Sequence, residues 1–447
     1  MAGLTSAKTL VNSAAQRTLK KYLANYAEPD TKVGGPLRRF NVLEAVDAVF
    51  ILPIYDEPWD QLRTFLNPLD LSKKIAMVWV FNCPDDVSDE AFVRTNEALD
   101  NLKSAYQFEQ LNERVSSSRV SENLSLYVLE RCQKGALIPK DQGVGLARKL
   151  GMDLALALCD EQLDAGLNAP DWLHCCDADV SLPSGYFDID PPARGQVASL
   201  YPFTHRPEPG YELAMALYDF RLHYYEAQLA RAGSPYAFQT VGSIIAVTPL
   251  AYAQVRGMPK RSGGEDFYFL NKLAKVGSVL TLSGPKLDIA GRPSHRVPIG
   301  TGPAIQAIRT QADPLNDYLY YHPEIFIRLA ALLECVRATD SVLSREQFAA
   351  QLRASVDVGR ASGILSALDK LGVAKFFAHV KGQTHRQSFA QLFDTWFDGF
   401  ITLKFVHEMR ELDCPSLSIE GLHAQSGLLS EELLSSITTV LKNQYRQ

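Results

Sequence analysis

The sequence predicts an α/β fold with a mostly parallel, doubly wound sheet and a helical C-terminal region. In the first two thirds of the chain, short apolar runs alternate with helical patterns, as in a sheet whose strands are joined by helices. One apolar run, at 171–176, leads directly into two aspartates, which is typical of a buried strand with polar groups at its carboxyl end. From about residue 315 onward, amphipathic helical patterns follow one another.

Composition excludes several classes of protein. Of the 447 residues, 46% are apolar and 21% are charged, which suffices for a large core. The net charge of −6 and the pI near 5.9 argue against a nucleic-acid-binding or polybasic membrane-binding surface. No run approaches the roughly 18 apolar residues of a membrane span, and the N-terminus does not resemble a secretory signal. We therefore expect no transmembrane segment and no nucleic-acid partner.

The cysteines favour a reducing compartment. They are scattered, odd in number and contain no CxxC pair, and several lie in apolar runs. They are Cys83, Cys132, Cys159, Cys175, Cys176, Cys335 and Cys414. Because disulfides are rare in the cytosol, this pattern predicts a cytoplasmic protein with free thiols.

The elements follow in a regular order. The predicted strands are 48–54, 74–81, 124–129, 171–176, 197–201 and 241–247. A helix opens at Gly143 with leucines at four-residue spacing (Leu146, Leu150, Leu154, Leu158), and further helices are predicted at 211–232 and from 263 to about 276. This order predicts a helical lead-in at 1–45, an α/β domain at 46–312 and a helical C-terminal region at 313–447.

Asp177 and Asp179 are the first candidate site. Ligands of open α/β sheets bind beyond the carboxyl ends of the strands, and carboxylates are suitable oxygen ligands for a divalent cation that holds phosphate. An Asx turn or a local cap is the alternative, because aspartate favours both. Taken alone, two aspartates at this spacing do not decide between these interpretations.

Glu265 and Asp266 form a second acidic pair, after Gly263 and Gly264. They stand where a helix begins, and the helix dipole favours negative charge there, so a helix cap is one interpretation. The other is a general base, since a carboxylate near a nucleophilic hydroxyl can accept its proton.

The loop at 291–302 is the third candidate. It carries His295, a possible metal ligand, between Arg292 and Arg296, and it ends in glycines. Arginine beside histidine suits a diphosphate and its cation. A surface loop with incidental basic residues remains the alternative.

Taken in order, these elements resemble the nucleotide-sugar-dependent glycosyltransferases of the GT-A fold, and family 2 most closely. The matching segments are Pro53 to Glu57 after the first strand, Gly143 to Gly151 at a glycine-rich helix start, Asp177 to Asp179, Gly242-Ser243, Val255 to Pro259, and Glu265-Asp266. The chain departs from the family at Asn82, where the family has an aspartate that meets the base, and at Lys149, where it has asparagine. The resemblance covers about residues 45–300 and implies that the domain at 46–312 is the catalytic domain.

The resemblance implies a fold and a set of roles. The fold would be a GT-A doubly wound mixed sheet with a C-terminal helical extension. Asp266, with Glu265 beside it, would serve catalysis by taking the proton of the acceptor hydroxyl. Asp179, Asp177 and His295 would hold Mn²⁺ or Mg²⁺. The nucleotide sugar would contact Pro53, Tyr55, Glu57, Asn82, Arg148, Asp177, Gly242 and Arg296.

The implied activity is the transfer of a sugar from a nucleotide-diphosphate sugar to an acceptor hydroxyl, with a divalent cation. A base at Asp266 predicts inversion, whereas His295 as a third metal ligand would suit a retaining enzyme. In processive synthases of this family, a pair such as Gln306 and Arg309 is followed by a tryptophan, and the protein has membrane spans. This chain has neither feature, so we expect non-processive transfer. Donor sugar, base and acceptor stay open.

Two other interpretations remain. A sugar-1-phosphate nucleotidyltransferase would carry a glycine-rich loop directly after the first strand, where this chain has no glycine. A nucleotide-binding scaffold without activity would explain the departures at Asn82 and Lys149. The apolar faces of residues 340–447 suit a core, or an interface that forms a homo-oligomer.

Overall fold

The computed structural model describes residues 2–32, 45–66, 72–294, 296, 298–339, 343–381 and 388–443, with side chains from residue 14 to residue 442. The chain forms two compact units. The first comprises Met1–Arg206, Thr240–Ala290 and Ser294–Gly300, and the second comprises Pro207–Gln239, Gly291–Pro293 and Thr301–Gln447.

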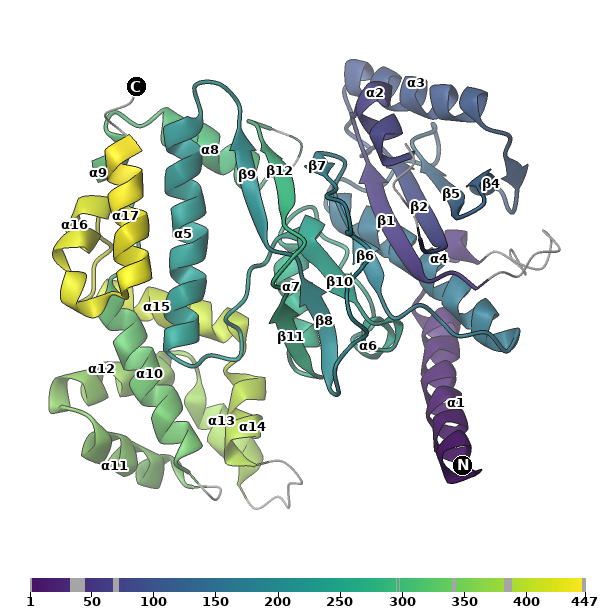
Figure 1. Cartoon of the computed structure of the whole chain (residues 1–447). Helices are drawn as coiled ribbons and strands as arrows, with labels where there is room; N and C mark the ends of the chain where they lie inside the picture. The colour runs from purple at the N-terminus through teal and green to yellow at the C-terminus, as the bar shows by residue number, and fades with distance from the viewer. Residues whose placement is uncertain are drawn as a thin grey trace. The chain divides into compact units, whose positions relative to one another are not determined.

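A mixed sheet is the centre of the first unit (Figure 1), and its order among the described residues is β11-β8-β10-β6-β1-β2-β5-β4-β3. Four neighbouring strands are parallel: β6 (Leu173–Cys175), β1 (Ala48–Ile54), β2 (Ile75–Asn82) and β5 (Leu124–Arg131). β10 (Ile245–Val247) lies antiparallel between β6 and β8 (Gln196–Leu200), and β11 (Ser278–Thr281) is parallel to β8. The prediction of an α/β fold with a mixed sheet is confirmed.

The chain order of the strands reverses between β1 and β6. From β1 the chain proceeds to β2 and then to β5 on one side, while β6 takes the other side of β1. Such a switch point leaves a crevice beyond the carboxyl ends of the two strands. Pro53 lies at this end of β1. The Cys176 N–H donates to the Ile51 carbonyl (3.0 Å), so two residues later the Pro53 nitrogen faces the β6 side. Since β6 has already ended, no ladder bond is lost there.

Several strands differ from the predicted ones. β4 (Val115–Ser121) pairs antiparallel with β5 and with the short β3 (Glu109–Gln110), although its serines are weak strand formers. The run at 241–247 begins as a 3₁₀ turn (Gly242–Ile244) before β10. A second small sheet, in the order β7-β12-β9, was not predicted. Its strands are β7 (Val180–Ser181), β12 (Leu287–Gly291) and β9 (Phe203–Pro207).

The first unit also contains helices, most of which lie between two strands along the chain (Figure 1). They are α1 (Ala2–Asn25), α2 (Trp59–Leu62), α3 (Asp89–Ala105), α4 (Gly143–Asp164), α6 (Pro249–Gln254) and α7 (Glu265–Leu273), with 3₁₀ turns at Pro29–Thr31 and Arg63–Leu66. α4 packs on β1 and β2. A Cβ atom on Gly151 would lie 2.4 Å from the Ile51 side chain, so a glycine is needed for this close approach.

A buried polar network joins α1 to α4 and α6. The Lys149 ammonium donates to the Tyr22 hydroxyl (2.7 Å), to Asp153 Oδ2 (2.8 Å) and to the Tyr26 carbonyl (2.9 Å). The hydroxyls of Tyr22 and Tyr252 both donate to Asp153 Oδ1, at 2.6 and 2.7 Å. The predicted lead-in helix therefore belongs to the first unit, and Lys149 is a partner of Asp153 within it.

The second unit is helical. Its helices are α5 (Glu212–Arg231), α8 (Thr301–Arg309), α9 (Pro314–Asp317), α10 (Pro323–Arg337), α11 (Arg345–Ser355), α12 (Val358–Lys370), α13 (Val373–Val380), α14 (Phe389–Trp396), α15 (Gly399–Leu412), α16 (Ile419–Ala424) and α17 (Glu431–Asn443), with a 3₁₀ turn at Ser426–Leu428. α5 packs against α8, α10 and α17. This division differs from the predicted domains, which placed α5 and residues 301–312 in the catalytic domain.

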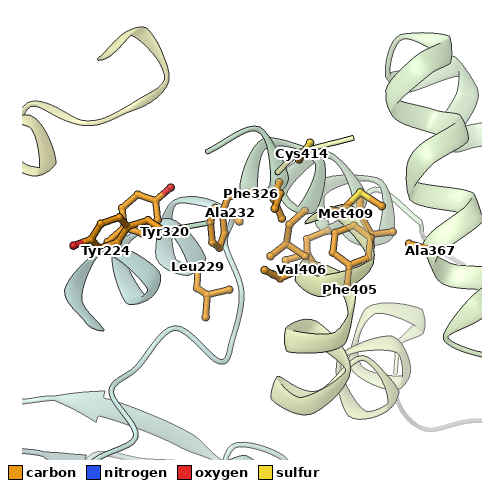
Figure 2. Packing of buried hydrophobic residues seen from close by; sticks show 14 of the residues in the cluster. Tyr224, Leu229, Ala232, Tyr320, Phe326, Ala367, Phe405, Val406, Met409 and Cys414 are labelled. Carbon is orange, nitrogen blue, oxygen red and sulfur yellow. The ribbon is translucent and has the colours of Figure 1, made fainter. Parts of the chain in front are cut away.

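One apolar core explains the position of α5. Figure 2 shows Tyr224 and Leu229 of α5 in the same cluster as Phe326 of α10 and Phe405 of α15. The aromatic side chains Phe376, Phe377, Phe389, Phe393 and Phe397 are also buried in this core, and Trp396 packs against it. The apolar faces of the C-terminal helices thus serve as the core of their own unit, and a homo-oligomer stays a prediction.

Candidate active site

The segment from Asp177 to Asp179 follows the carboxyl end of β6, at the switch point of the sheet. It follows β6 and leads into β7, and backbone bonds hold both of its ends. The Cys176 N–H donates to the Ile51 carbonyl of β1 (3.0 Å), and the Ala290 N–H of β12 donates to the Asp179 carbonyl (3.0 Å). The Asp177 side chain is one-third exposed, so this carboxylate lies at the boundary of the interior.

Arg148 of α4 brings two acidic segments together. One guanidinium nitrogen (Nη2) donates to Asp177 Oδ1 and the other (Nη1) donates to Glu265 Oε1. The side chain of Arg148 is buried, as is that of Glu265. Gly242 lies against this guanidinium, because a Cβ atom there would come within 2.4–2.5 Å of three of its atoms. The predicted residues Asp177, Glu265, Arg148 and Gly242 therefore form one cluster.

Asp266 is the second residue of α7 and lies half-buried beside this cluster. The Phe267 N–H donates to Asp266 Oδ1 (2.7 Å). Burial, together with the negative charge of Glu265, raises the pKa of Asp266 from 3.8 to about 7, although the Arg148 cation acts in the opposite direction. A carboxyl group with a pKa near 7 can exchange a proton at neutral pH, as a general base requires.

Beyond the end of β1, the buried Glu57 forms an ion pair with the partly exposed Arg296. The Arg296 guanidinium donates to Glu57 Oε1, and also to the Tyr55 carbonyl (3.1 Å). Burial opposes the cationic form of Arg296, but the charges of Glu57, Asp179 and Asp56 together raise its pKa. The loop after β12 therefore places a cation near Asp179. His295, predicted as a metal ligand, lies outside the described residues.

Asn82 is the last residue of β2, and its side chain bonds to the end of β1. Its side-chain amide nitrogen donates to the carbonyls of Ile54 (3.0 Å) and Val80 (3.1 Å), and the side chain is buried. With both N–H groups engaged, the amide tethers the end of β1 to β2. Tyr55, in the same turn, is half-buried, and burial raises the pKa of its hydroxyl. The predicted contacts of Asn82 and Tyr55 with a nucleotide stay predictions.

Asp177 and Asp179 have the oxygen ligands that a divalent-cation site requires. Among the described residues, no group of three or more histidine, cysteine or acidic side chains is arranged to hold a metal ion. Mg²⁺, however, is often bound by one or two carboxylates together with substrate phosphates. Asp179 and the second oxygen of Asp177 fit that requirement, while Asp177 Oδ1 already accepts from Arg148.

The glycine-rich helix start has a role that the sequence did not predict. A Cβ atom on Gly145 would lie 2.4 Å from the Pro259 carbonyl oxygen, and one on Gly143 would lie 2.8 Å from Ser262 Cα. The Gly145 N–H donates to the Arg261 carbonyl (3.0 Å). These glycines let α4 begin directly against the loop that leads into α7.

Gln61 was not predicted. From α2, its side-chain amide donates to the carbonyl of Ala178, between the two aspartates. Nothing in the local sequence distinguishes this glutamine from an exposed helix residue, because its partner is more than a hundred positions away. Gln306 and Arg309 have partners on Tyr211 instead: the tyrosine hydroxyl donates to Gln306 (2.8 Å), and Arg309 stacks 4.3 Å from the ring centre.

No described helix is long and apolar enough to cross a membrane. All seven cysteines are buried free thiols. No protein-family model matches the chain, and a search of curated proteins finds no match either.

Proposed function

We propose that this chain is a cation-dependent glycosyltransferase that moves a sugar from a nucleotide-diphosphate sugar to an acceptor hydroxyl with inversion of configuration. One observation carries the proposal: the carboxylates of Asp177 and Glu265 meet on the guanidinium of Arg148, with Asp266 beside them, at the switch point of the sheet. Switch-point crevices are where open α/β sheets bind their ligands.

The residues divide the reaction between them. Asp266 takes the proton of the acceptor hydroxyl as its oxygen forms a bond to the anomeric carbon, and the bond from that carbon to the diphosphate breaks. Negative charge then grows on the leaving diphosphate, near the Arg296 cation. A divalent cation, held by Asp179 and Asp177, would supply Lewis-acid stabilisation of the same charge when bound.

The proton affinity of Asp266 favours inversion. In an inverting transfer, a base on the acceptor side must be deprotonated before the attack and must then hold the proton. A pKa of about 7 allows both at neutral pH. A retaining mechanism requires no such base.

A thermal-shift screen tests the proposal. UDP-, GDP- and other nucleotide sugars are added with and without Mn²⁺. A donor at a hundred times its Kd stabilises the native state by about 2.7 kcal/mol. The best donor is then incubated with candidate acceptors, and the released nucleotide is identified. Release of a nucleoside diphosphate supports the proposal, whereas release of pyrophosphate supports a nucleotidyltransferase. If no nucleotide sugar stabilises the protein, the proposal is wrong.

A further inference from the structure

Arg148 contacts two carboxylates that would serve opposite sides of the proposed reaction. Asp177 follows β6, on the side where the donor diphosphate would bind, and Glu265 directly precedes the base candidate Asp266. Each carboxylate accepts from a different nitrogen of the same guanidinium. A planar guanidinium holds two acceptors in a defined geometry, which an ammonium group cannot reproduce.

The surroundings of Arg148 leave its guanidinium little access to a ligand. The residue is 4% exposed, and both Nη atoms are engaged by carboxylates. The backbone at Gly242 lies against the guanidinium, at a distance that would not admit a Cβ atom. Because two anions surround it, the buried cation is compensated, and its removal would leave both carboxylates without their partner.

The helix that carries Arg148 is itself held in place. One turn earlier, Gly145 lies in backbone contact with the loop at 259–261, and one turn later, Gly151 lies against Ile51 of β1. Arg148 therefore extends from a helix that is packed closely on both sides towards the carboxyl end of β6 and the amino end of α7.

We propose that Arg148 is a positioning residue that fixes Asp177 and Glu265 relative to each other, and so couples the donor side of the site to the base, without contacting the donor. This role rests on the proposed function. It departs from the role that the family resemblance implies for Arg148, which is contact with the nucleotide sugar.

The test compares R148K and R148M with the unchanged protein. We expect R148M to lower kcat by about 10–100-fold, as loss of a residue that orients a ligand does. Without donor, the pKa of Asp266 should rise by at least about one unit, because an opposite charge is removed. Glu265 on its own helix and Asp177 after β6 also act on Asp266, and both raise its pKa. In R148K, the pKa of Asp266 and kcat should both lie between the values of R148M and those of the unchanged protein.

The pKa of Asp266 is measured by ¹³C NMR of carboxyl-labelled aspartate, with the signal assigned by its absence in D266N. This measurement needs no substrate. If no sugar transfer occurs but the titration still follows the charge at position 148, the proposed function is wrong and the electrostatic coupling stands. If R148M only weakens donor binding and leaves the Asp266 titration unchanged, Arg148 is a donor ligand and the positioning role is wrong.

A matched control separates positioning from stability. Arg328 of the second unit is also buried and also bonds two carboxylates, Glu324 (3.4 Å) and Asp413 (2.7 Å). R328M should lower stability but leave kcat and the Asp266 titration unchanged. If R148M fails to fold, kcat and the Asp266 titration are compared in R148K and in the double variant R148M/E265Q instead. The double variant removes one of the carboxylates that R148M leaves uncompensated.

Discussion

Replacing Asp266 by asparagine should make the protein more stable at neutral pH while removing its activity. Asparagine has the same shape and can still accept from the Phe267 N–H, but it cannot ionise. In the wild-type protein, burial and the neighbouring Glu265 charge raise the pKa of Asp266 from 3.8 to about 7. The folded state therefore keeps a proton that the unfolded chain releases.

The direction in which stability changes with pH follows from proton linkage. Between pH 4 and pH 7 the folded protein binds more protons than the unfolded chain at this position, so its stability falls as pH rises. The two pKa values differ by roughly three pH units, and about 1.4 kcal/mol per unit gives an upper limit of about 4 kcal/mol. Because Asp266 is only half-buried, solvent screening reduces this, and we expect about 2–4 kcal/mol at pH 8.

The assay is urea denaturation of wild type and D266N from pH 5 to pH 8, followed by tryptophan fluorescence. Trp59, Trp79 and Trp172 lie in the first unit and report on it. The advantage of D266N should grow by up to about 1.4 kcal/mol per pH unit and level off above pH 7. D60N, at an exposed carboxylate, is the control. If D266N differs from wild type equally at pH 5 and pH 8, the raised pKa is wrong.

Three further variants test the site and its support. D179N should abolish transfer and the Mn²⁺-dependent thermal shift with nucleotide sugars, while circular dichroism stays unchanged; a normal shift would exclude Asp179 as a metal ligand. G242A should lower activity and cost about 1–3 kcal/mol in urea denaturation, since its Cβ atom would displace Arg148. K149M should lower the melting temperature and cost about 3–5 kcal/mol, because it leaves the buried Asp153 without its cation.

K140M provides the control for K149M. Lys140 pairs with Asp86 at the surface, and its side chain is 74% exposed. Such a change is expected to alter stability by no more than about 0.5 kcal/mol. A loss in K149M no larger than that in K140M would contradict the role of the buried network.

Local sequence pattern sufficed for the strands that are buried along their whole length. Every residue of β1 and β2 is buried, and both were predicted within one residue of their observed bounds. The acidic pairs were also predictable as groups at strand and helix ends. β4 was not, because its serines become a strand only through pairing with β5.

The partners of the site residues could not be predicted. Arg148 and Lys149 are adjacent in α4, yet one bonds carboxylates at the site and the other bonds Asp153 and α1. Helix periodicity places adjacent residues on different faces, but it does not say what each face meets. The second unit shows the same limit, since the helical pattern of α5 does not reveal that it packs with helices a hundred residues later.

Elements that depend on local pattern were thus determined by the sequence alone: the buried strands, the helices, and the aspartates at the end of β6. Burial periodicity and turn chemistry act over a few residues, so they can be read along the chain. The tertiary structure alone decided that Asp177, Glu265 and Asp266 share one cation. The pKa of Asp266 depends in part on Arg148 and Asp177, which are distant in sequence, because a charge acts through space.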